Sequence, residues 1–422
     1  MYKVSSTKKS IRCDITLPSS KSIINRLLVI NHLSGGKPVN GLELQASDIV
    51  TMQSLLAEIT NRRNNSDETI EINVGNAGTV MRFLTAVLAV TDGNWLICGT
   101  ERMHQRPIRP LTDALLEIGA ELSFVNQEGY PPVKIRGNSS LAGGKVQLNA
   151  GISSQFISAL MMIAPLLKGG LEIEMQGEII SGSYIRMTQN LMRKAGAGVE
   201  FSGNRVLIGD AIYHSFDFTS IVEPDWSAAA FWYQVAAFSD DAHILLRGLK
   251  ADSVQGDSIL PELFSKFGVH TEFSGDGVLI TKPVQEKVSE FNFDFTDCPD
   301  LAQAVIVTCA ALGIQGRFSG LKTLRVKETD RIAALERELT KLGYYTVVVE
   351  DQILLSGKIP QRTDKDTSVL TLCYDDHRMA MSFAPLALLH KEIRLDEPEV
   401  VRKSYPAFWR DMMMAGLVVV GD

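Results

Sequence analysis

The sequence predicts a mixed α/β (α+β) protein of two domains, each built from three similar units. The chain has 422 residues, which is too long for one ordinary hydrophobic core, so we expect two domains. A phrase consisting of an amphipathic helix end, a glycine and a short strand recurs along the chain at a nearly constant interval. Each interval has room for two helices and several strands, and about six such units divide evenly into two domains.

The copies of this phrase are regular enough to be a true repeat. They read LLEIGAELSFV, LMRKAGAGVEF, LFSKFGVHTEF, LTKLGYYTVVV and MMMAGLVVV, with glycines Gly119, Gly196, Gly268, Gly343 and Gly416. A degenerate first copy without the glycine is SLLAEIT at 54–60. A glycine directly after a helix readily takes a positive φ and ends that helix, so we expect this conformation at all five.

Composition excludes several classes of protein. The net charge of −7 argues against a general nucleic-acid binder, so any basic site must be local. Five scattered cysteines without a CxxC motif indicate reduced thiols rather than a disulfide framework. The first residues lack a signal peptide, and no apolar run reaches transmembrane length. We therefore expect a cytoplasmic protein that binds neither nucleic acid nor a membrane.

The N-terminal elements raise the question of an anion site. Residues 11–17 alternate as in a strand, and residues 23–33 are apolar at helical spacing, so PSS at 18–20 is a strand-to-helix turn. Lys21 then lies at a helix N-terminus, which already carries a partial positive charge. Either the site receives an anion, with Ser22 and Arg26 beside it, or Lys21 is an ordinary solvated lysine.

Two further stretches of the first half favour anion binding. In VGNAGTVMRFL (74–84), Gly78 precedes an apolar helix, but no Walker lysine follows, which disfavours an NTPase. In GTERMHQRPIRPL (99–111), three arginines (Arg102, Arg106 and Arg109) could bind phosphate or carboxylate oxygens, or could form an exposed basic loop.

A polar trio begins the apolar helix of GISSQFISALM (151–161). Ser153, Ser154 and Gln155 offer neutral hydrogen bonds to a polyol or a phosphate. A simple N-cap would account for one serine but not for all three residues.

The second half contains charged residues at predicted helix starts. In RVKETDRIAAL (325–335) we expect Lys327, Glu328 and Arg331 within about one helical turn, with the two cations on one face. An anion or Glu328 would have to separate those cations, unless this is a solvated helix face. In DCPDLAQAV (297–305), Asp300 suits either an N-cap or a base.

The last two stretches carry acidic and basic residues together. YDDHRMAMSFAPLAL (374–388) places Asp375, Asp376, His377 and Arg378 before an apolar helix. A metal site is disfavoured because the two adjacent carboxylates point in different directions. VVRKSYPAF (400–408) adds Lys403 near the C-terminus.

Together these stretches resemble the 5-enolpyruvylshikimate-3-phosphate (EPSP) synthase family. The matching motifs LPSSKSIINR, GNAGTVMR, RMHQRPIRPL, SSQFISALM, RVKETDRI, DDHRMAM and KSYP occur in order from 17 to 406. The resemblance implies a two-lobed enolpyruvyl transferase fold with three βαβαββ-type repeats per lobe, helices inside and sheets outside. Residues 1–19 with 223–422 would form lobe I and residues 20–222 lobe II, with the active site in the cleft between them.

The resemblance also implies the reaction and its residues. The enolpyruvyl group of phosphoenolpyruvate is transferred to the 5-hydroxyl of shikimate 3-phosphate by addition and elimination, without metal or cofactor. Asp300, Glu328 and Lys21 are the expected catalytic residues. The residues expected to bind shikimate 3-phosphate are Lys21, Ser22, Arg26, Ser153, Ser154, Gln155, Ser181, Asp300 and Lys327, with Tyr184 nearby. Those expected to bind phosphoenolpyruvate are Lys21, Gly78, Arg102, Gln155, Arg331, Arg378 and Lys403. Glyphosate is the expected inhibitor, and a monomer is the expected state.

Three positions depart from the family pattern: Ser19 replaces a glycine, Phe83 a proline or leucine, and Thr323 an asparagine. The related transferase for UDP-N-acetylglucosamine remains an alternative, but it uses a cysteine five residues before an Arg-Pro pair. Here Glu101 stands at that distance from Arg106, and Cys98 lies three residues too early. A non-catalytic protein that binds phosphorylated metabolites is the other alternative.

Overall fold

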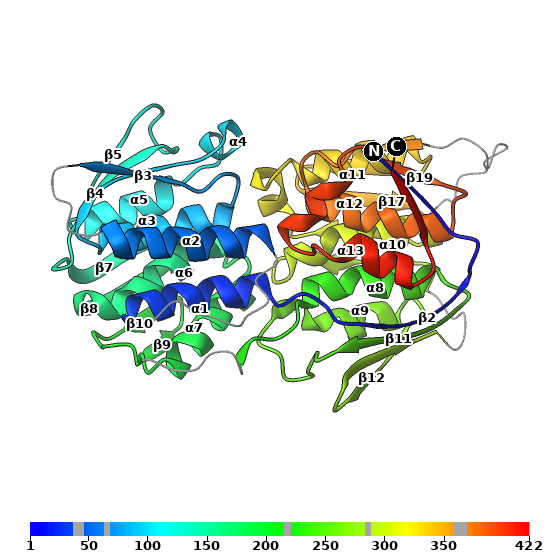
Figure 1. Ribbon diagram of the computed structural model, residues 1–422, viewed down its shortest axis with the longest axis horizontal. Coiled ribbons are helices and arrows are strands. Elements are labelled where there is room, and N and C mark those ends of the chain that lie inside the picture. The colour runs from blue at the N-terminus through cyan, green and yellow to red at the C-terminus, as the bar shows by residue number, and fades with distance from the viewer. Residues whose placement is uncertain (37–45, 63–67, 215–220, 283–287, 358–368, 422) are drawn as a thin grey trace. The chain divides into compact units, whose positions relative to one another are not determined.

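The computed structural model describes residues 1–36, 46–62, 68–214, 221–282, 288–357 and 369–421, drawn in colour in Figure 1. The chain divides into two compact units: unit 1 comprises Met1–Ser20 and Glu223–Asp422, and unit 2 comprises Lys21–Val222. The sequence places the first passage between units one residue earlier. Each unit is described by itself.

Unit 2 contains a central set of helices and two described sheets. Its helices are α1 (Lys21–Leu33), α2 (Ser47–Arg62), α3 (Gly78–Ala89), α4 (Glu101–His104), α5 (Arg109–Glu117), α6 (Ser154–Ile163), the 3₁₀ helix η1 (Ala164–Leu166) and α7 (Gly182–Lys194). Its strands are β3 (Thr69–Asn73), β4 (Gly93–Cys98), β5 (Glu121–Phe124), β6 (Val133–Gly137), β7 (Ala142–Asn149), β8 (Lys168–Gln176), β9 (Val199–Ser202) and β10 (Arg205–Ile208).

Unit 1 contains both chain ends and three described sheets. Its α-helices are α8 (Trp226–Phe238), α9 (Leu260–Ser265), α10 (Ala302–Leu312), α11 (Arg331–Lys341), α12 (His377–Phe383) and α13 (Phe408–Met414). Its 3₁₀ helices are η3 (Gly256–Ile259), η4 (Pro299–Leu301), η5 (Lys322–Val326), η6 (Ala384–Leu388) and η7 (Pro398–Lys403). Its strands are β1 (Tyr2–Ser5), β2 (Ser10–Ile15), β11 (Asp241–Arg247), β12 (His270–Ser274), β13 (Gly277–Thr281), β14 (Phe293–Asp294), β15 (Gln315–Ser319), β16 (Thr346–Val349), β17 (Gln352–Ser356), β18 (Val369–Thr371), β19 (Ile393–Leu395) and β20 (Val418–Gly421).

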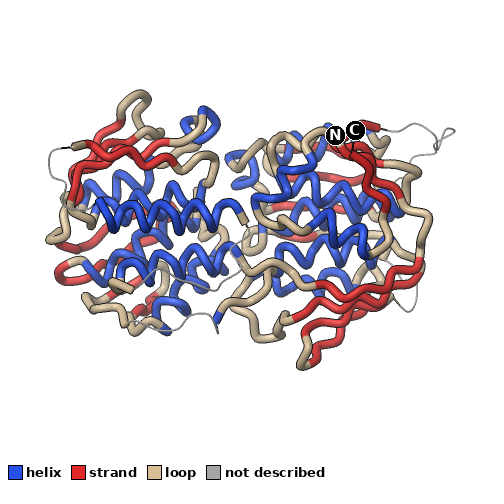
Figure 2. Tube along the Cα trace, viewed as in Figure 1, coloured by secondary structure: helices blue, strands red, loops and turns tan. Residues whose placement is uncertain are grey.

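Helices form the core of each unit, and the strands lie toward its outside (Figure 2). In unit 1, all residues of α8 and α12 are buried, and only Leu312 of α10 is not. In unit 2, α3 and α6 are buried almost as completely. A helix that is apolar on every side belongs in a core. The strands instead alternate between buried and exposed residues, as in β3, so each sheet covers the helices with one face.

The described residues form five four-stranded sheets with one shared topology: β3-β4-β6-β5, β7-β8-β10-β9, β2-β11-β13-β12, β14-β15-β17-β16 and β18-β19-β1-β20. In each, the first pair is parallel and the next two pairs are antiparallel. Strands β1 and β2 from the N-terminus complete two sheets that are otherwise built from the last half of the chain. Three of these sheets belong to unit 1 and two to unit 2.

The repeated glycines behave as the sequence predicts. Gly119, Gly196, Gly268, Gly343 and Gly416 all have positive φ, between 77° and 98°. Each is followed by a strand (β5, β9, β12, β16 or β20) that lies at one edge of its sheet. The helix end and the edge strand are thus joined by a residue whose conformation only glycine adopts without strain.

The two segments that connect the units bond to each other within unit 1. Ser20 N donates to Glu223 O at 2.8 Å, and Asp225 N donates to Pro18 O at 2.9 Å. Ser19, which replaces the family's glycine, pairs with Pro224 and is not among the residues with positive φ. Serine therefore fits this position without backbone strain.

Two further findings concern membrane-spanning helices and cysteines in the described part of the chain. None of its helices is long and apolar enough to cross a membrane. All five cysteines are free thiols, as the sequence predicts.

Candidate active site

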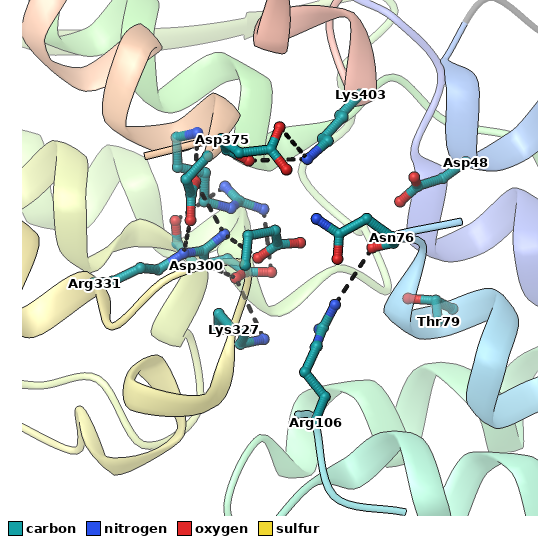
Figure 3. A network of polar contacts seen from close by, with 12 residues as sticks. Asp48, Asn76, Thr79, Arg106, Asp300, Lys327, Arg331, Asp375 and Lys403 are labelled. Carbon is teal, nitrogen blue, oxygen red and sulfur yellow. Dashed lines mark hydrogen bonds and ion pairs between the residues drawn. The ribbon is translucent and has the colours of Figure 1, made fainter. Parts of the chain in front are cut away.

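Unit 1 holds an arginine surrounded by three carboxylates. Arg331 is only 1% exposed. Its Nε donates to Asp376 Oδ2 at 2.7 Å and its Nη2 to Glu328 Oε2 at 3.0 Å. Its Nη1 donates to Asp300 Oδ1 at 3.3 Å (Figure 3). Burial opposes the charge of Arg331, but the three carboxylates outweigh it and raise its pKa. Arg331 is therefore a permanent, fixed cation.

The local sequence sets the position of this arginine. Asp330 accepts a hydrogen bond from Ala333 N at 3.1 Å and caps α11, so the helix begins at Arg331. Lys327 is extended, with φ −81° and ψ −157°, and follows η5. The prediction that Lys327 and Arg331 share one helix face is wrong, because the capping aspartate starts the helix between them.

Asp300 is the acceptor for several cations of unit 1. Its Oδ2 lies 3.1 Å from Arg378 Nη2, and its Oδ1 lies 3.8 Å from Lys327 Nζ. Arg378 Nη1 also donates to Asp300 O at 3.0 Å. Burial lowers the pKa of Lys327, while Asp300 opposes this effect. Asp300 is not the N-cap of α10, since Leu301 occupies that position. Its carboxylate pairs with the side chains of Arg331, Arg378 and Lys327 instead.

A strained turn presents the next acidic residues. Tyr374 and Asp375 have φ of 57° and 51°, a left-handed conformation that non-glycine residues rarely adopt. Asp376 then accepts from Arg378 N at 2.9 Å and caps α12. Lys403 Nζ lies 2.9 Å from Asp375 Oδ1 and donates to Asp375 O at 2.8 Å (Figure 3). The turn thus directs one aspartate to Arg331 and its neighbour to Lys403.

In unit 2, Lys21 is the first residue of α1 and pairs with Asp48. Lys21 Nζ lies 3.0 Å from Asp48 Oδ2, and the two side chains are 16% and 14% exposed. The lysine is therefore mostly buried at a helix N-terminus and is not an ordinary solvated side chain. Asp48, near the start of α2, was not predicted from the sequence.

Arg26 is buried in unit 2 between two rings. Its guanidinium lies 5.3 Å from the centre of Phe83 and 5.7 Å from the centre of Tyr184. It donates to Thr188 Oγ1 at 2.7 Å and to Ser158 Oγ at 3.1 Å. Burial lowers the pKa of Arg26 to about 10, and Tyr184 opposes this shift. Arg26 remains protonated at neutral pH, although its bonding partners are uncharged groups.

The start of α3 lies against Arg106. A Cβ placed on Gly78 would be 2.4 Å from Arg106 Nη2. Arg106 is 5% exposed and its Nη1 donates to Asn76 O at 3.4 Å (Figure 3). By contrast, Arg102 donates to Gln105 Oε1 at 3.3 Å, and the three atoms nearest to a Cβ on Gly78 all belong to Arg106. The family resemblance implied Arg102, and not Arg106 of the same motif, as the arginine that binds phosphoenolpyruvate.

The polar trio lies at the start of α6, as predicted. Ser153 caps the helix by accepting from Gln155 N at 3.3 Å. Gln155 Nε2 donates to Thr79 Oγ1 at 3.0 Å, which links the trio to the start of α3. Ser154 is buried. The cap accounts for Ser153, and the side chains of Ser154 and Gln155 take no part in it.

Two further positions have unusual surroundings. Ser181, just before α7, has φ 59° and its side chain makes no capping bond. In unit 1, the Thr323 hydroxyl is buried and has no hydrogen-bond partner among the described residues. A bound ligand would satisfy such a hydroxyl.

Comparison with known proteins identifies the family. A sequence model of EPSP synthase, described as 3-phosphoshikimate 1-carboxyvinyltransferase, matches residues 6–412. The chain belongs to the EPSP synthase family. A 3-phosphoshikimate 1-carboxyvinyltransferase of Bacteroides fragilis (strain YCH46) is 44% identical over 99% of this chain and 98% of its own length. One from Sulfurovum sp. is 34% identical over 94% of this chain and 95% of its own length.

Solved structures show the same fold. The EPSP synthase of Acinetobacter baumannii superimposes with a TM-score of 0.72 at 21% identity, covering 100% of this chain and 99% of that one. The predicted mixed α/β fold of the family, with helices and several small sheets, is confirmed. The family motifs lie in both units. In unit 1, ion pairs join five of the predicted residues: Asp300, Lys327, Glu328, Arg331 and Arg378. Lys403 is bound to the adjoining turn through Asp375.

In unit 2, six of the predicted residues lie at three helix starts. Lys21 and Ser22 begin α1, Gly78 begins α3, and the trio begins α6.

No group of three His, Cys, Asp or Glu residues in the described ranges is arranged to hold a metal.

Proposed function

We propose that the fixed cations of both units bind the two substrates of the EPSP synthase reaction. In that reaction the enolpyruvyl group of phosphoenolpyruvate is transferred to the 5-hydroxyl of shikimate 3-phosphate, and phosphate is released. The observation that carries the proposal is the buried Arg331, held by three carboxylates in a chain of net charge −7. Two anionic substrates repel each other, so cations fixed in advance must offset this repulsion.

Shikimate 3-phosphate is bound in this proposal by hydroxyl, amide and cationic groups. These are Lys21, Ser22, Arg26, Ser153, Ser154, Gln155, Ser181, Asp300 and Lys327. Support comes from the start of α6, where Ser154 and Gln155 are not needed for the cap. The buried hydroxyl of Thr323 supplies a further hydrogen bond in place of the family's asparagine.

Phosphoenolpyruvate is bound by Lys21, Gly78, Gln155, Arg331, Arg378 and Lys403, together with an arginine of the 99–111 stretch. We assign that role to Arg106 rather than to the predicted Arg102, because Arg106 lies against Gly78. A glycine at position 78 allows the guanidinium to approach the N-terminus of α3, where backbone N–H groups favour an anion.

The catalytic roles follow from charge and position. Asp300 takes the proton of the 5-hydroxyl as that oxygen attacks C2 of phosphoenolpyruvate, because its ionised form is stabilised by Arg331, Arg378 and Lys327. Glu328 or Lys21 delivers a proton to C3. The tetrahedral intermediate then loses a proton from C3 and phosphate from C2, which gives the enolpyruvyl ether.

The finer properties of the protein are also part of the proposal. We expect a cytoplasmic monomer that glyphosate inhibits at the phosphoenolpyruvate subsite. Phe83 weakens that inhibition, because its ring lies on Arg26 and belongs to α3, the helix that begins at Gly78.

Phosphate release by the purified protein tests the reaction. Release that needs both phosphoenolpyruvate and shikimate 3-phosphate supports it, with each substrate alone as a control. UDP-N-acetylglucosamine replaces the acceptor in a parallel assay, and release there would support the rival transferase instead. No release with either acceptor from a folded protein would favour a binding-only role.

A further inference from the structure

A second carboxyl, Asp257, is buried in unit 1 within electrostatic reach of Asp300. It belongs to η3 and is 3% exposed. Its Oδ2 accepts a hydrogen bond from the Ser227 hydroxyl, and its Oδ1 has no hydrogen-bond partner among the described residues. A buried carboxylate that forms no ion pair is costly, and such groups normally keep their proton. No motif in the sequence pointed to this residue.

The charged and titratable groups facing Asp257 come from several elements. Asp300 of η4 and Asp225 before α8 raise its pKa, while Arg378 of α12 and the bond from Ser227 lower it. Burial is the largest influence, and together they raise the pKa of Asp257 to about 7.

The two carboxyls differ in their partners. Asp300 lies within ion-pair distance of Arg331, Arg378 and Lys327. Among the described residues, the only hydrogen-bond partner of the Asp257 carboxyl is the Ser227 hydroxyl. When two carboxyls influence each other electrostatically, the one whose ionised form is less stabilised keeps its proton to higher pH. That residue is Asp257.

We propose that Asp257 is a positioning residue that keeps its proton and stays neutral while Asp300 acts as the charged base. It does so through Asp300 and Arg378 and without touching the substrates. The inference rests on the role of Asp300 in the proposed function. When Asp257 ionises as the pH rises through neutrality, a further negative charge that acts on Arg378 weakens the binding of both anionic substrates. KM therefore rises with pH, while kcat, measured with saturating substrates, does not fall.

The test is the pH dependence of kcat and KM between pH 6 and pH 9 for the wild type and for Asp257→Asn. Asparagine keeps the shape and stays neutral, so we expect KM to lose its rise above pH ~7. The phosphates of the substrates also titrate near pH 6, but equally for both enzymes, so the ratio of the two profiles isolates Asp257.

Ser227→Ala provides a second, independent variant in case Asp257→Asn does not fold. It removes the one bond that favours the ionised form, worth about 1 kcal/mol, so the inflection moves to higher pH by about 0.7 of a unit. Asp411→Asn is the matched control: this carboxyl is also buried in unit 1, but it bonds Tyr405 and Arg410. We expect it to keep the wild-type profile.

An active wild type whose KM profile is unchanged in both Asp257→Asn and Ser227→Ala would overturn the inference. A lower melting temperature with an unchanged profile would also overturn it, because that is the result of a merely structural role. A wild type that releases no phosphate at all would instead contradict the proposed function, so the two failures are distinguishable.

Discussion

Arg106 leaves no room for a side chain on Gly78. A Cβ at that position would lie 2.4 Å from Nη2 and 2.7 Å from Cζ of the arginine. The glycine has an ordinary φ, so its small size, and not its backbone freedom, is what the position requires. The pair forms one wall of the proposed phosphoenolpyruvate subsite.

Gly78→Ala should therefore impair the site without unfolding the protein. The methyl group displaces the end of a flexible side chain, which costs little stability, but it moves the guanidinium away from its ligand. We expect KM for phosphoenolpyruvate to rise about tenfold to a hundredfold while the melting temperature stays nearly unchanged. Steady-state kinetics and thermal unfolding check both parts, and an unchanged KM would contradict the proximity argument.

Arg106 and Arg102 can be distinguished by the same substitution. Loss of a hydrogen bond to a charged group costs about 1.5–3 kcal/mol, so Arg106→Gln should raise KM for phosphoenolpyruvate about 10- to 100-fold. Arg102→Gln serves as the matched control and should change it little. The opposite ranking would restore the original assignment to Arg102.

Phe83 should influence shikimate 3-phosphate through Arg26. Phe83→Leu removes the ring that lies 5.3 Å from the guanidinium. Loss of this contact and of buried volume should destabilise the protein by about 1–2 kcal/mol and raise KM for shikimate 3-phosphate. Leucine is chosen over proline because proline inside α3 would break a helix hydrogen bond.

Phe267→Leu in the core of unit 1 is the control for that experiment, since it removes a buried ring that packs on Phe264 and Phe291. It should lower stability with no change in KM. If both variants change KM equally, Phe83 has no particular role. Glyphosate inhibition should become stronger in Phe83→Leu, and equal inhibition would contradict the proposed effect of the ring.

Asp257 should also make the free energy of unfolding depend on pH. Its pKa is 3.8 in the unfolded chain and about 7 in the fold, so the folded state holds a proton that the unfolded state has lost between these values. The free energy of unfolding therefore falls as pH rises from about 4 to about 7, by on the order of 2–4 kcal/mol. Denaturant unfolding of Asp257→Asn should lack this loss, and parallel pH curves for the two proteins would exclude it.

The features that the sequence predicted correctly depend on local chemistry. The five repeated glycines and the cap at Ser153 follow from residues within a few positions of a helix end. The parallel pairing of β2 with β11 could not be predicted in this way, because Ile11 and Ala242 are partners from distant parts of the chain.

The site showed the same limit. Lys327 and Arg331 have helical spacing, which predicts one helix containing both. Asp330 lies between them and caps α11, so only Arg331 is in the helix. Arg106 could not be distinguished from Arg102 because the direction of each side chain depends on packing against α3. Asp257 was missed entirely, since only burial makes it unusual.

The central claim is that cations of both units act on the same pair of substrates. The most direct measurement is phosphate release, with both substrates present, by the wild type, Lys21→Met and Lys403→Met. Lys21 belongs to unit 2 and Lys403 to unit 1. We expect both variants to fold and each to lose about a hundredfold or more of the rate. Near-normal release by either folded variant would contradict the claim.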